Sequence, residues 1–437
     1  MTDLSPQTPS QNAPNDAAGL PARATALDLL TAALGGRAGM DEGLSHPALA
    51  ALDGRDRAFA RALVMATLRH LGPIDAALQA RVKKAPPDKV VQILRLGVAQ
   101  AFVLKTPAHA AVGTSVDLVA QDKGLQMFKG LVNAVLRGLV REPPRLDDPE
   151  LLAPGWLYAR WRAAFGAGEA LKIAAMIAEE PATDLSLKDR AQAETLAAEL
   201  EATVLPGGSL RTERRGDIAT WPGFAEGAWW VQDAAAAIPA RLLAVQAGET
   251  ALDMCAAPGG KTLQLAAAGA QVVAVDRAPA RLTRVAENLA RLNLTAETMA
   301  ADAATWPERR TFDTVLLDAP CSATGTFRRH PDVLWAAKPS DVAGLAAVQS
   351  KLLDAAARRL KSGGRLVYCV CSLEPEEGEG QVAAFLGRTP GMALDPIAAG
   401  EGGAPAPSVR PDGTLRILPH HIEGGLDGFY VARFRKA

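Results

Sequence analysis

The sequence predicts an α/β protein whose C-terminal part is a doubly wound, Rossmann-like domain, preceded by an all-α region and a small α+β module. Two patterns support this fold class. Up to Arg141, apolar residues recur every three or four positions, which is the period of amphipathic helices. From about Gly248, short apolar runs alternate with helical segments, and this βαβ rhythm is typical of a parallel sheet covered by helices on both faces.

The chain of 437 residues divides into four predicted segments. Residues 1–21 are rich in Pro, Gln, Asn, Ala and Ser, and they predict a disordered tail that lacks the basic start and apolar stretch of a signal peptide. The helical region spans 22–145 and its last helix ends at Pro143-Pro144, the mixed module spans 150–228, and the sheet domain spans 229–437. Because no run of 18 uncharged apolar residues occurs, we expect a cytoplasmic protein without a membrane span.

The helical region is basic. Residues 22–145 contain 17 Lys and Arg against 10 Asp and Glu, a net charge of +7 that leaves −8 for the rest of the chain. Within 128–141, one face is apolar, and the other carries a polar row made of Lys129, Asn133, Arg137 and Arg141. Such a row suits contacts with nucleic-acid phosphates, although an ordinary solvated helix face would show the same spacing.

The segment 150–228 mixes helical and extended patterns. Gly168–Glu179 has helical periodicity, whereas Thr183–Lys188 alternates like a strand. Glycine and proline indicate turns at 206–208 and 221–223. We therefore predict a small α+β module here.

The sheet domain contains five predicted strands and three predicted helices. The strands are Thr250–Met254, Gln271–Val275, Glu297–Ala300, Thr314–Leu317 and Arg365–Val370. The helices are Thr262–Ala268, Pro279–Leu292 and Asp341–Leu360. Ligands of such sheets bind at the carboxyl ends of the strands, and the fourth and fifth strands are expected to be neighbours. The residues that follow each strand are therefore the candidate site.

The residues after the first three strands indicate a nucleoside-containing cofactor. The first strand leads into a loop of Cys255, Ala256, Ala257, Pro258, Gly259, Gly260 and Lys261. Its glycines permit close approach of a ligand, but the loop matches neither the dinucleotide fingerprint nor the phosphate loop. Asp276 follows the second strand, where a carboxylate commonly accepts hydrogen bonds from ribose, and Asp302 follows the third, where it can meet a base edge.

Two cysteines follow the fourth and fifth strands. Asp318 and Cys321 come after one strand and Cys371 after the other, so we expect both thiols to face one substrate. Cys369 lies inside the fifth strand and is interpreted as core packing. A thiolate is a strong nucleophile where a nearby cation lowers its pKa, and Lys261 is a candidate for that cation. A lone cysteine is usually a small buried hydrophobe, but two at adjacent strand ends favour a chemical role.

Two charged segments flank the cysteines. The Cys321 loop is followed by a basic segment that is a candidate for binding RNA phosphates, made of Arg328, Arg329 and His330. The acidic residues of 374–379 precede an apolar run and are interpreted as the start of a helix. The four cysteines form no Cys-x-x-Cys pair, so neither a zinc site, nor any other metal site, nor a disulfide is expected.

Three motifs carry a family resemblance. They are LDMCAAPGGKT at 252–262, DAPCSATG at 318–325 and YCVCSLEPEE at 368–377. With these motifs the chain resembles the NOL/Nop/Sun family of RNA cytosine-5 methyltransferases. The segment Gly130–Arg137 is similar to the RNA-binding NusB fold. This combination resembles the bacterial RsmB (Sun/Fmu) type over nearly the whole chain after Ala22.

The resemblance implies a cofactor, a substrate and a division of labour. S-adenosyl-L-methionine is held by the loop 255–261 with Asp276, Asp302 and Asp318. The methyl group goes to carbon 5 of a cytosine in small-subunit (16S) ribosomal RNA. Cys371 is the nucleophile and Cys321 assists product release, because a thiolate that adds to carbon 6 makes carbon 5 nucleophilic. We expect a monomer that acts on deproteinised 16S ribosomal RNA, since a cytosine flips out more easily from unpacked RNA.

Three alternatives stay open at this point. The substrate is a transfer RNA rather than ribosomal RNA, or Cys321 is the nucleophile, as in DNA cytosine methyltransferases that attack with a Pro-Cys thiol. The third alternative is a non-catalytic RNA-binding assembly factor. Lys188 stands where the family usually has Asn, and Cys369 replaces a usual small residue; both departures concern substrate recognition more than chemistry.

Overall fold

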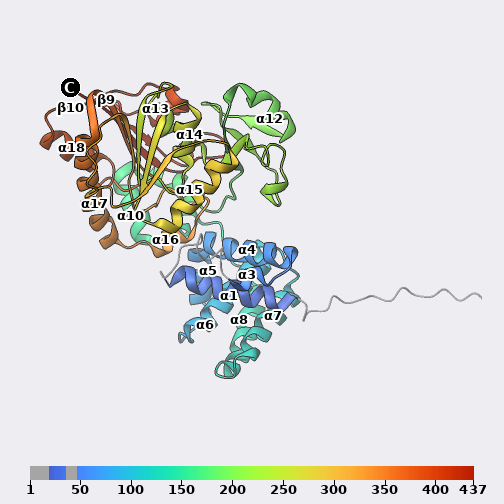
Figure 1. The fold of residues 1–437 in the computed structure, drawn as a ribbon. Helices are drawn as coiled ribbons and strands as arrows, with labels where there is room; N and C mark the ends of the chain where they lie inside the picture. Colours follow the sequence, from blue (N-terminus) through green and yellow to red (C-terminus); the bar gives the residue numbers. More distant parts are fainter. Residues whose placement is uncertain (1–18, 36–46) are drawn as a thin grey trace, which may run out of the picture. The chain divides into compact units, whose positions relative to one another are not determined.

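The computed structural model describes residues 19–35 and 47–437, and the chain forms two compact units, 1–152 and 153–437 (Figure 1). We call them the helical unit and the sheet unit. The tail predicted over 1–21 lies outside the described residues except at its end, where Leu20 and Pro21 begin the first helix. Within the described ranges, no helix is both long enough and apolar enough to cross a membrane.

The helical unit consists of helices throughout its described part, as the periodicity predicts. They are α1 (Leu20–Leu34), α3 (Pro47–Ala50), α4 (Gly54–Arg69), α5 (Leu71–Gln79), α6 (Asp88–Val98), η2 (Ala99–Val103), α7 (Ala108–Gln121), η3 (Gln126–Phe128), α8 (Lys129–Arg141) and α9 (Pro149–Leu152). The predicted apolar stripe of α8 is largely buried, through Val132, Val135, Leu136 and Leu139. This stripe packs against α6 and α7.

The sheet unit begins with two helices and a small antiparallel sheet of order β2-β3-β1-β4. The elements are α10 (Gly155–Phe165), α11 (Ala167–Ala175), β1 (Thr183–Leu187), η4 (Arg190–Gln192), α12 (Ala193–Glu199), β2 (Ala202–Val204), β3 (Leu210–Thr212), η5 (Ile218–Thr220) and β4 (Trp229–Val231). Strand β1 is the one that the alternation predicts. Strand β4 lies past the predicted end of the module at 228, because Val231 pairs with Leu185 in this sheet.

The larger sheet has the order β10-β12-β9-β8-β5-β6-β7. Its elements are α13 (Ala234–Leu242), β5 (Thr250–Met254), α14 (Gly260–Ala267), β6 (Gln271–Asp276), α15 (Pro279–Arg291), β7 (Glu297–Ala300), β8 (Phe312–Asp318), α16 (Asp332–Ala336), α17 (Pro339–Arg359), β9 (Leu360–Val370), α18 (Glu379–Arg388), β10 (Met392–Leu394), η6 (Glu401–Gly403), η7 (Ala406–Ser408), β11 (Leu415–Ile417) and β12 (Phe429–Lys436). The five predicted strands, β5 to β9, are parallel. The sequence analysis assigns no strand after 370, yet β12 pairs antiparallel with β9, so the sheet is mixed.

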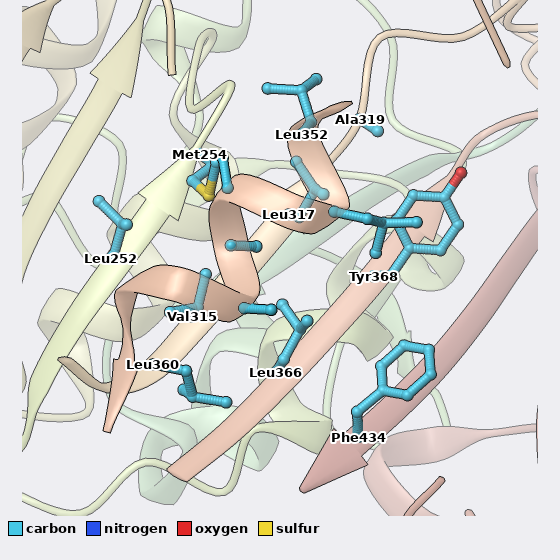
Figure 2. Close-up of a cluster of buried hydrophobic side chains, with 14 of the residues drawn as sticks. Leu252, Met254, Val315, Leu317, Ala319, Leu352, Leu360, Leu366, Tyr368 and Phe434 are labelled. Atoms are coloured by element: carbon cyan, nitrogen blue, oxygen red, sulfur yellow. The ribbon is translucent and has the colours of Figure 1, made fainter. Parts of the chain in front are cut away.

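Side chains of the central strands alternate between two apolar layers. On one face, Leu317 and Tyr368 pack with Leu352 of α17, as Figure 2 shows. On the other face, Leu316 and Val367 are covered by residues of α13 and α14. Because both faces are buried, these strands are continuous apolar runs in the sequence.

The carboxyl ends of β8 and β9 lie side by side. The pairing of Asp318 with Cys369 is the last in their register, so the loops that follow both strands start at the same edge of the sheet. Gly325 of the first loop donates its N–H to the carbonyl of Cys371 (3.0 Å) and accepts from the N–H of Gly428 (2.8 Å). The approach of Gly428 leaves no room for a side chain at Gly325, where a Cβ would lie 2.1 Å from the Gly428 oxygen.

We expect Gly325→Ala to lower the free energy of unfolding of the sheet unit by about 2 kcal/mol, because backbone rather than a flexible side chain must move. Gly344→Ala is the matched control. Gly344 lies on α17 with nothing within 4 Å of an added Cβ, and the change is expected to raise the free energy by about 0.5–1 kcal/mol. Urea unfolding of both variants checks this, and equal effects would contradict the close approach at Gly325.

Candidate active site

The loops after β8 and β9 carry the two predicted cysteines next to each other. Cys321 Sγ lies 3.4 Å from Cys371 Sγ, which is within hydrogen-bond distance for sulfur. Both side chains are half-buried, and neither is in a disulfide. The structure thus brings together the two thiols that the strand order predicts to share one edge of the sheet.

A buried carboxylate ties the two loops to each other. Glu377 has no exposed surface. Its Oε1 accepts hydrogen bonds from the backbone N–H of Ser322 (2.9 Å) and from Gln349 Nε2 (3.0 Å). Its Oε2 accepts from the hydroxyls of Ser322 and Ser372, both at 2.5 Å. Because these serines directly follow Cys321 and Cys371, one carboxylate holds in place the residue that follows each thiol.

The acidic segment therefore differs from its prediction. Helix α18 begins only at Glu379, and both Glu374 and Glu377 are fully buried. Glu374 pairs with Arg160 of α10. The interpretation of this segment as the start of a helix is wrong for these two residues, which precede α18 and whose carboxylates accept from residues distant in sequence, Arg160 for Glu374 and Ser322 and Gln349 for Glu377.

The cysteine pair is electrostatically asymmetric. The hydrogen bond to Cys371, followed by burial and by the charge of Cys371, holds the pKa of the Cys321 thiol well above its ordinary value. Cys321 accordingly keeps its proton and is the natural donor in the contact between the two sulfurs. The distance alone allows either sulfur to donate, and it is the raised pKa of Cys321 that favours Cys371 as the acceptor.

Lys261 occupies the predicted place beside the pair. It is 8% exposed, and its Nζ donates to Asp318 Oδ2 (2.7 Å) and lies 5.4 Å from the centre of the Phe429 ring. Burial lowers the pKa of Lys261, but the charges of Asp318, Cys369 and Cys371 outweigh it, and the net pKa is raised. The ammonium group is therefore charged and interacts with the sulfur of Cys371.

Cys369 lies deeper than the other two thiols. It is fully buried, and burial raises its pKa well above the ordinary value. Its Sγ donates to Asp318 Oδ1 at 3.4 Å. It is a member of the apolar layer under α13, which agrees with its interpretation as core packing.

The basic segment 328–330, predicted to bind phosphates, is largely withdrawn from the surface. Arg328 is 1% exposed, donates to the carbonyl of Gly424 (2.5 Å) and lies 3.8 Å from the carboxylate of Asp233. The prediction that Arg328 contacts a phosphate is therefore wrong, because its guanidinium does not reach the surface. His330 is half-buried.

Arg329 is a second cation near Cys371, and the sequence analysis missed this role. It forms an ion pair with the fully buried carboxylate of Asp427, 98 positions away. Burial lowers the pKa of Arg329, but the charges of Asp427, Asp233 and Cys371 raise it overall. The only local signal for this role was that Arg329 lies close to Cys321 in the sequence. Its partner Asp427 is distant in the sequence, so no local pattern predicts the ion pair.

The loop after β5 is shaped by the carboxylate at the end of β6. Cys255 (φ 64°) and Gly259 (φ 106°) adopt left-handed backbone conformations that turn the chain. Asp276 is 4% exposed; its Oδ2 accepts from the N–H of Ala257 (3.0 Å) and its Oδ1 from that of Ala278 (2.9 Å). Asp276, which was predicted to accept hydrogen bonds from ribose, thus also holds the loop after β5 in place.

Two further aspartates border the same loop. Asp302 is exposed just after β7, and its Oδ1 accepts from the N–H of Ala304 (2.9 Å). Asp253 is fully buried, and its Oδ2 accepts from the Thr262 hydroxyl (2.6 Å), while its Oδ1 has no hydrogen-bond partner among the described residues. Burial raises the pKa of Asp253 to about 7. Asp253 was not among the predicted site residues, because it lies within the predicted strand Thr250–Met254.

Comparison with known proteins points to one family. The model described as 16S rRNA methyltransferase RsmB/F matches residues 240–435, and the NusB family model matches 20–141. Ribosomal RNA small subunit methyltransferase B of Vibrio cholerae serotype O1 is 39% identical over 408 residues, which cover 87% of this chain and 90% of the relative. The protein of the same name from Pseudomonas syringae pv. tomato is 38% identical over 438 residues, covering 95% and 96%. The chain belongs to the ribosomal RNA small subunit methyltransferase B family.

A solved structure agrees with this assignment. The methyltransferase homologue from Pyrococcus horikoshii is 26% identical to this family member and covers 69% of it, with 98% of that chain aligned and a TM-score of 0.55. The predicted resemblance and fold class are confirmed. In this chain, the NusB-like region runs from α1 to α8, and the region that matches the methyltransferase model includes β5 to β12.

The NusB-like region of the chain exposes most of the predicted polar row. Lys129, Arg137 and Arg141 are exposed, and Asn133 is half-buried. Arg137 Nε donates to Asn133 Oδ1 (2.8 Å), a contact between residues one helical turn apart. RNA binding by this row stays a prediction.

A cluster that the sequence analysis did not anticipate lies near the end of β11. Glu169, His420 and His421 each offer one potential metal-ligand atom, and these atoms lie within 4.8 Å of one another. Protein groups already engage them, because Lys172 donates to Glu169 (2.8 Å), His420 Nε2 lies 2.6 Å from Glu169 and Leu418 N–H donates to His421 Nδ1 (3.3 Å). We assign the cluster the role of attaching α11 to this loop.

Glu377→Gln tests the carboxylate between the two loops. The change places an NH₂ donor among groups that all donate, so we expect the free energy of unfolding to fall by about 2–4 kcal/mol and methyl transfer to drop at least tenfold. Glu287→Gln, an exposed residue of α15, is the control and should leave both unchanged. Unaltered transfer by Glu377→Gln would show that the loops hold their positions without this carboxylate.

The raised pKa of Asp253 predicts a pH-dependent stability. Between pH 4 and about 7 the native state keeps a proton that the unfolded state releases. The stabilising contribution is complete below the ordinary pKa and is lost as the pH rises through about 7. Relative to the wild type, Asp253→Asn should become more stable by about 1.4 kcal/mol per pH unit over this range. Urea unfolding at several pH values measures this, and a constant difference would contradict the assignment.

Proposed function

We propose that this chain transfers the methyl group of S-adenosyl-L-methionine to carbon 5 of a cytosine in small-subunit (16S) ribosomal RNA, through a covalent bond between Cys371 and the cytosine. The observation that carries the proposal is the contact of 3.4 Å between Cys321 and Cys371 at the joined ends of β8 and β9. Relatives named ribosomal RNA small subunit methyltransferase B support ribosomal over transfer RNA as the substrate.

The residues beside the pair fit the cofactor. S-adenosyl-L-methionine, when bound, supplies a methyl group on a positively charged sulfur. The loop 255–261 and the exposed carboxylate of Asp302 would hold its adenosine part. The buried Oδ1 of Asp253 has no hydrogen-bond partner in the part of the chain that the structure describes, and an acceptor in that state suits a ligand that brings a donor. Asp318 and Asp276 add negative charge close to the same loop.

Cys371 is proposed as the nucleophile because carbon 5 of cytosine is unreactive within an aromatic ring. The Cys371 thiolate forms a bond to carbon 6, and the electron pair of the C5–C6 double bond makes carbon 5 enamine-like, so that it takes up the methyl group. Loss of the proton from carbon 5 returns the electron pair, restores the double bond and expels the thiolate. Lys261 and Arg329 provide the positive surroundings in which a thiolate is stable.

Cys321 is proposed to assist release. Before attack, the charge of Cys371 and the contact with it keep the proton on Cys321. Once Cys371 is bonded to carbon 6 that charge is gone, so Cys321 releases its proton to solvent and its thiolate takes the proton from carbon 5, while the C6–S bond breaks and its electron pair returns to Cys371. The same asymmetry argues against the alternative in which Cys321 attacks, because a thiol that keeps its proton is a weak nucleophile. The intact pair also argues against a non-catalytic assembly factor, which would have no use for it.

Incubation with labelled S-adenosyl-L-methionine tests the activity. Deproteinised 16S ribosomal RNA, assembled small subunits and transfer RNA, all undermethylated, are compared side by side, and the modified base is mapped. We expect label at carbon 5 of a cytosine and the highest rate on deproteinised 16S ribosomal RNA. No label on any RNA would refute the proposal, and label on transfer RNA alone would change its substrate. Sizing of the enzyme in the same buffer tests whether a monomer is active.

The cysteine roles predict opposite phenotypes. Cys371→Ala should lose methyl transfer by at least about 10³-fold and form no covalent RNA adduct. Cys321→Ala should accumulate a protein–RNA adduct that survives denaturing electrophoresis. The reverse pattern would assign the attack to Cys321.

A further inference from the structure

A second basic site lies beside the small antiparallel sheet. A cavity of about 520 Å³ is bounded by the end of β1, η4, α13 and the second half of α14. Its charged lining residues are Lys188, Arg190 and Arg241, with Asp189 as the one acidic residue that lines it. The Asp189 carboxylate caps η4 by accepting from the N–H of Ala191 (2.9 Å). The cavity is therefore basic.

Neither arginine has a carboxylate partner within the described part of the chain. Arg190 Nη2 donates to the carbonyl of Gly207 (2.8 Å). Arg241 Nη2 donates to the Ser209 hydroxyl (2.7 Å), and its Nη1 lies 3.5 Å from the Gly402 carbonyl. These acceptors are neutral, and a guanidinium has five N–H donors. Arg190 is exposed and Arg241 is half-buried, so the remaining N–H donors face solvent or the cavity and are accessible to a ligand.

The two positive charges also disfavour each other. Burial, followed by the charge of Arg190, lowers the pKa of Arg241 to about 10. Arg241 is half-buried, so water does not fully compensate for the missing counter-charge. An anion between the guanidiniums would relieve both costs, and paired N–H donors match the oxygens of a phosphate.

The backbone around the arginines is fitted to them. Gly207 (φ 89°) and Gly208 (φ 83°) form a left-handed turn between β2 and β3. A Cβ at Gly207 would lie 2.6 Å from Arg241 Nη1, and one at Gly208 would lie 3.1 Å from Arg190 Nε. Both guanidiniums thus rest against one glycine turn, which orients them toward the same space.

We propose that Arg190 and Arg241 bind a backbone phosphate of the RNA substrate, as positioning residues for the cytosine that reaches Cys371. This inference rests on the proposed function. Gln264 lines the cavity and lies one turn after Lys261 on α14. A helix of this length is about 12 Å long, a span that about four nucleotides of one strand cover at roughly 3.4 Å each. The proposal requires that the RNA strand follows α14 from the active site to the arginines.

Binding of a 16S ribosomal RNA fragment at several salt concentrations tests the proposal. Arg241→Met and Arg190→Met should each weaken binding about 5- to 20-fold, and the variant that carries both changes should reduce the slope of log affinity against log salt by about 0.7–0.9, the value for one phosphate. Arg241→Lys keeps the charge and should retain most of the slope. Arg309→Met removes an exposed arginine outside the cavity and is the matched control. The affinity for S-adenosyl-L-methionine and the unfolding midpoint, which a merely structural role would alter, should stay unchanged.

The outcomes separate this inference from the proposed function. If both variants bind RNA like Arg309→Met while the wild type methylates it, the phosphate site is refuted and the proposed function stands. If inorganic phosphate binds to the wild type but RNA affinity is insensitive to both arginines, the cavity is a small-anion site and the inference is refuted. If the wild type methylates no RNA, the proposed function fails, whatever the arginines bind.

Discussion

The arrangement of the site depends on the buried carboxylate of Glu377. A carboxylate without exposed surface is costly unless its oxygens are fully engaged, and here four donors engage it. Two of these donors belong to Ser322 and one to Ser372, so removing the charge would release both cysteine loops at once. The contact between Gly325 and Gly428 adds a steric constraint on the same loops. These constraints hold the two loops in the positions that bring the sulfurs within 3.4 Å of each other.

The second principle of the site is that its charges are buried in opposite pairs. Lys261 pairs with Asp318, and Arg329 with Asp427, and both cations lie within electrostatic range of Cys371. Each pair is nearly neutral by itself. The cation of each pair is nevertheless held in a fixed position within electrostatic range of Cys371, where it can stabilise a thiolate. Cys321, in contrast, is kept protonated by its neighbour.

Much of this was readable from the sequence, because strands and their carboxyl ends follow local patterns. The five parallel strands lie where the apolar runs predict them, and Cys321, Cys371, Lys261 and Asp318 meet as expected. The misses share one cause. Glu377 and Arg328 have the local appearance of solvated charges, and only partners that are distant in sequence, such as Ser322 and Asp233, make them buried. The strand β12 was missed because it pairs antiparallel at the end of the chain, outside the βαβ rhythm.

The central claim is that Cys371 carries the reactive thiolate and that Cys321 keeps its proton. Competitive alkylation measures this directly. The native protein is treated with limiting iodoacetamide at several pH values between 6 and 9, and peptide mass spectrometry gives the rate for each thiol. The account predicts that Cys371 is modified first at every pH and that Cys321 reacts only after Cys371 is blocked or at the alkaline end. Faster modification of Cys321 would contradict it.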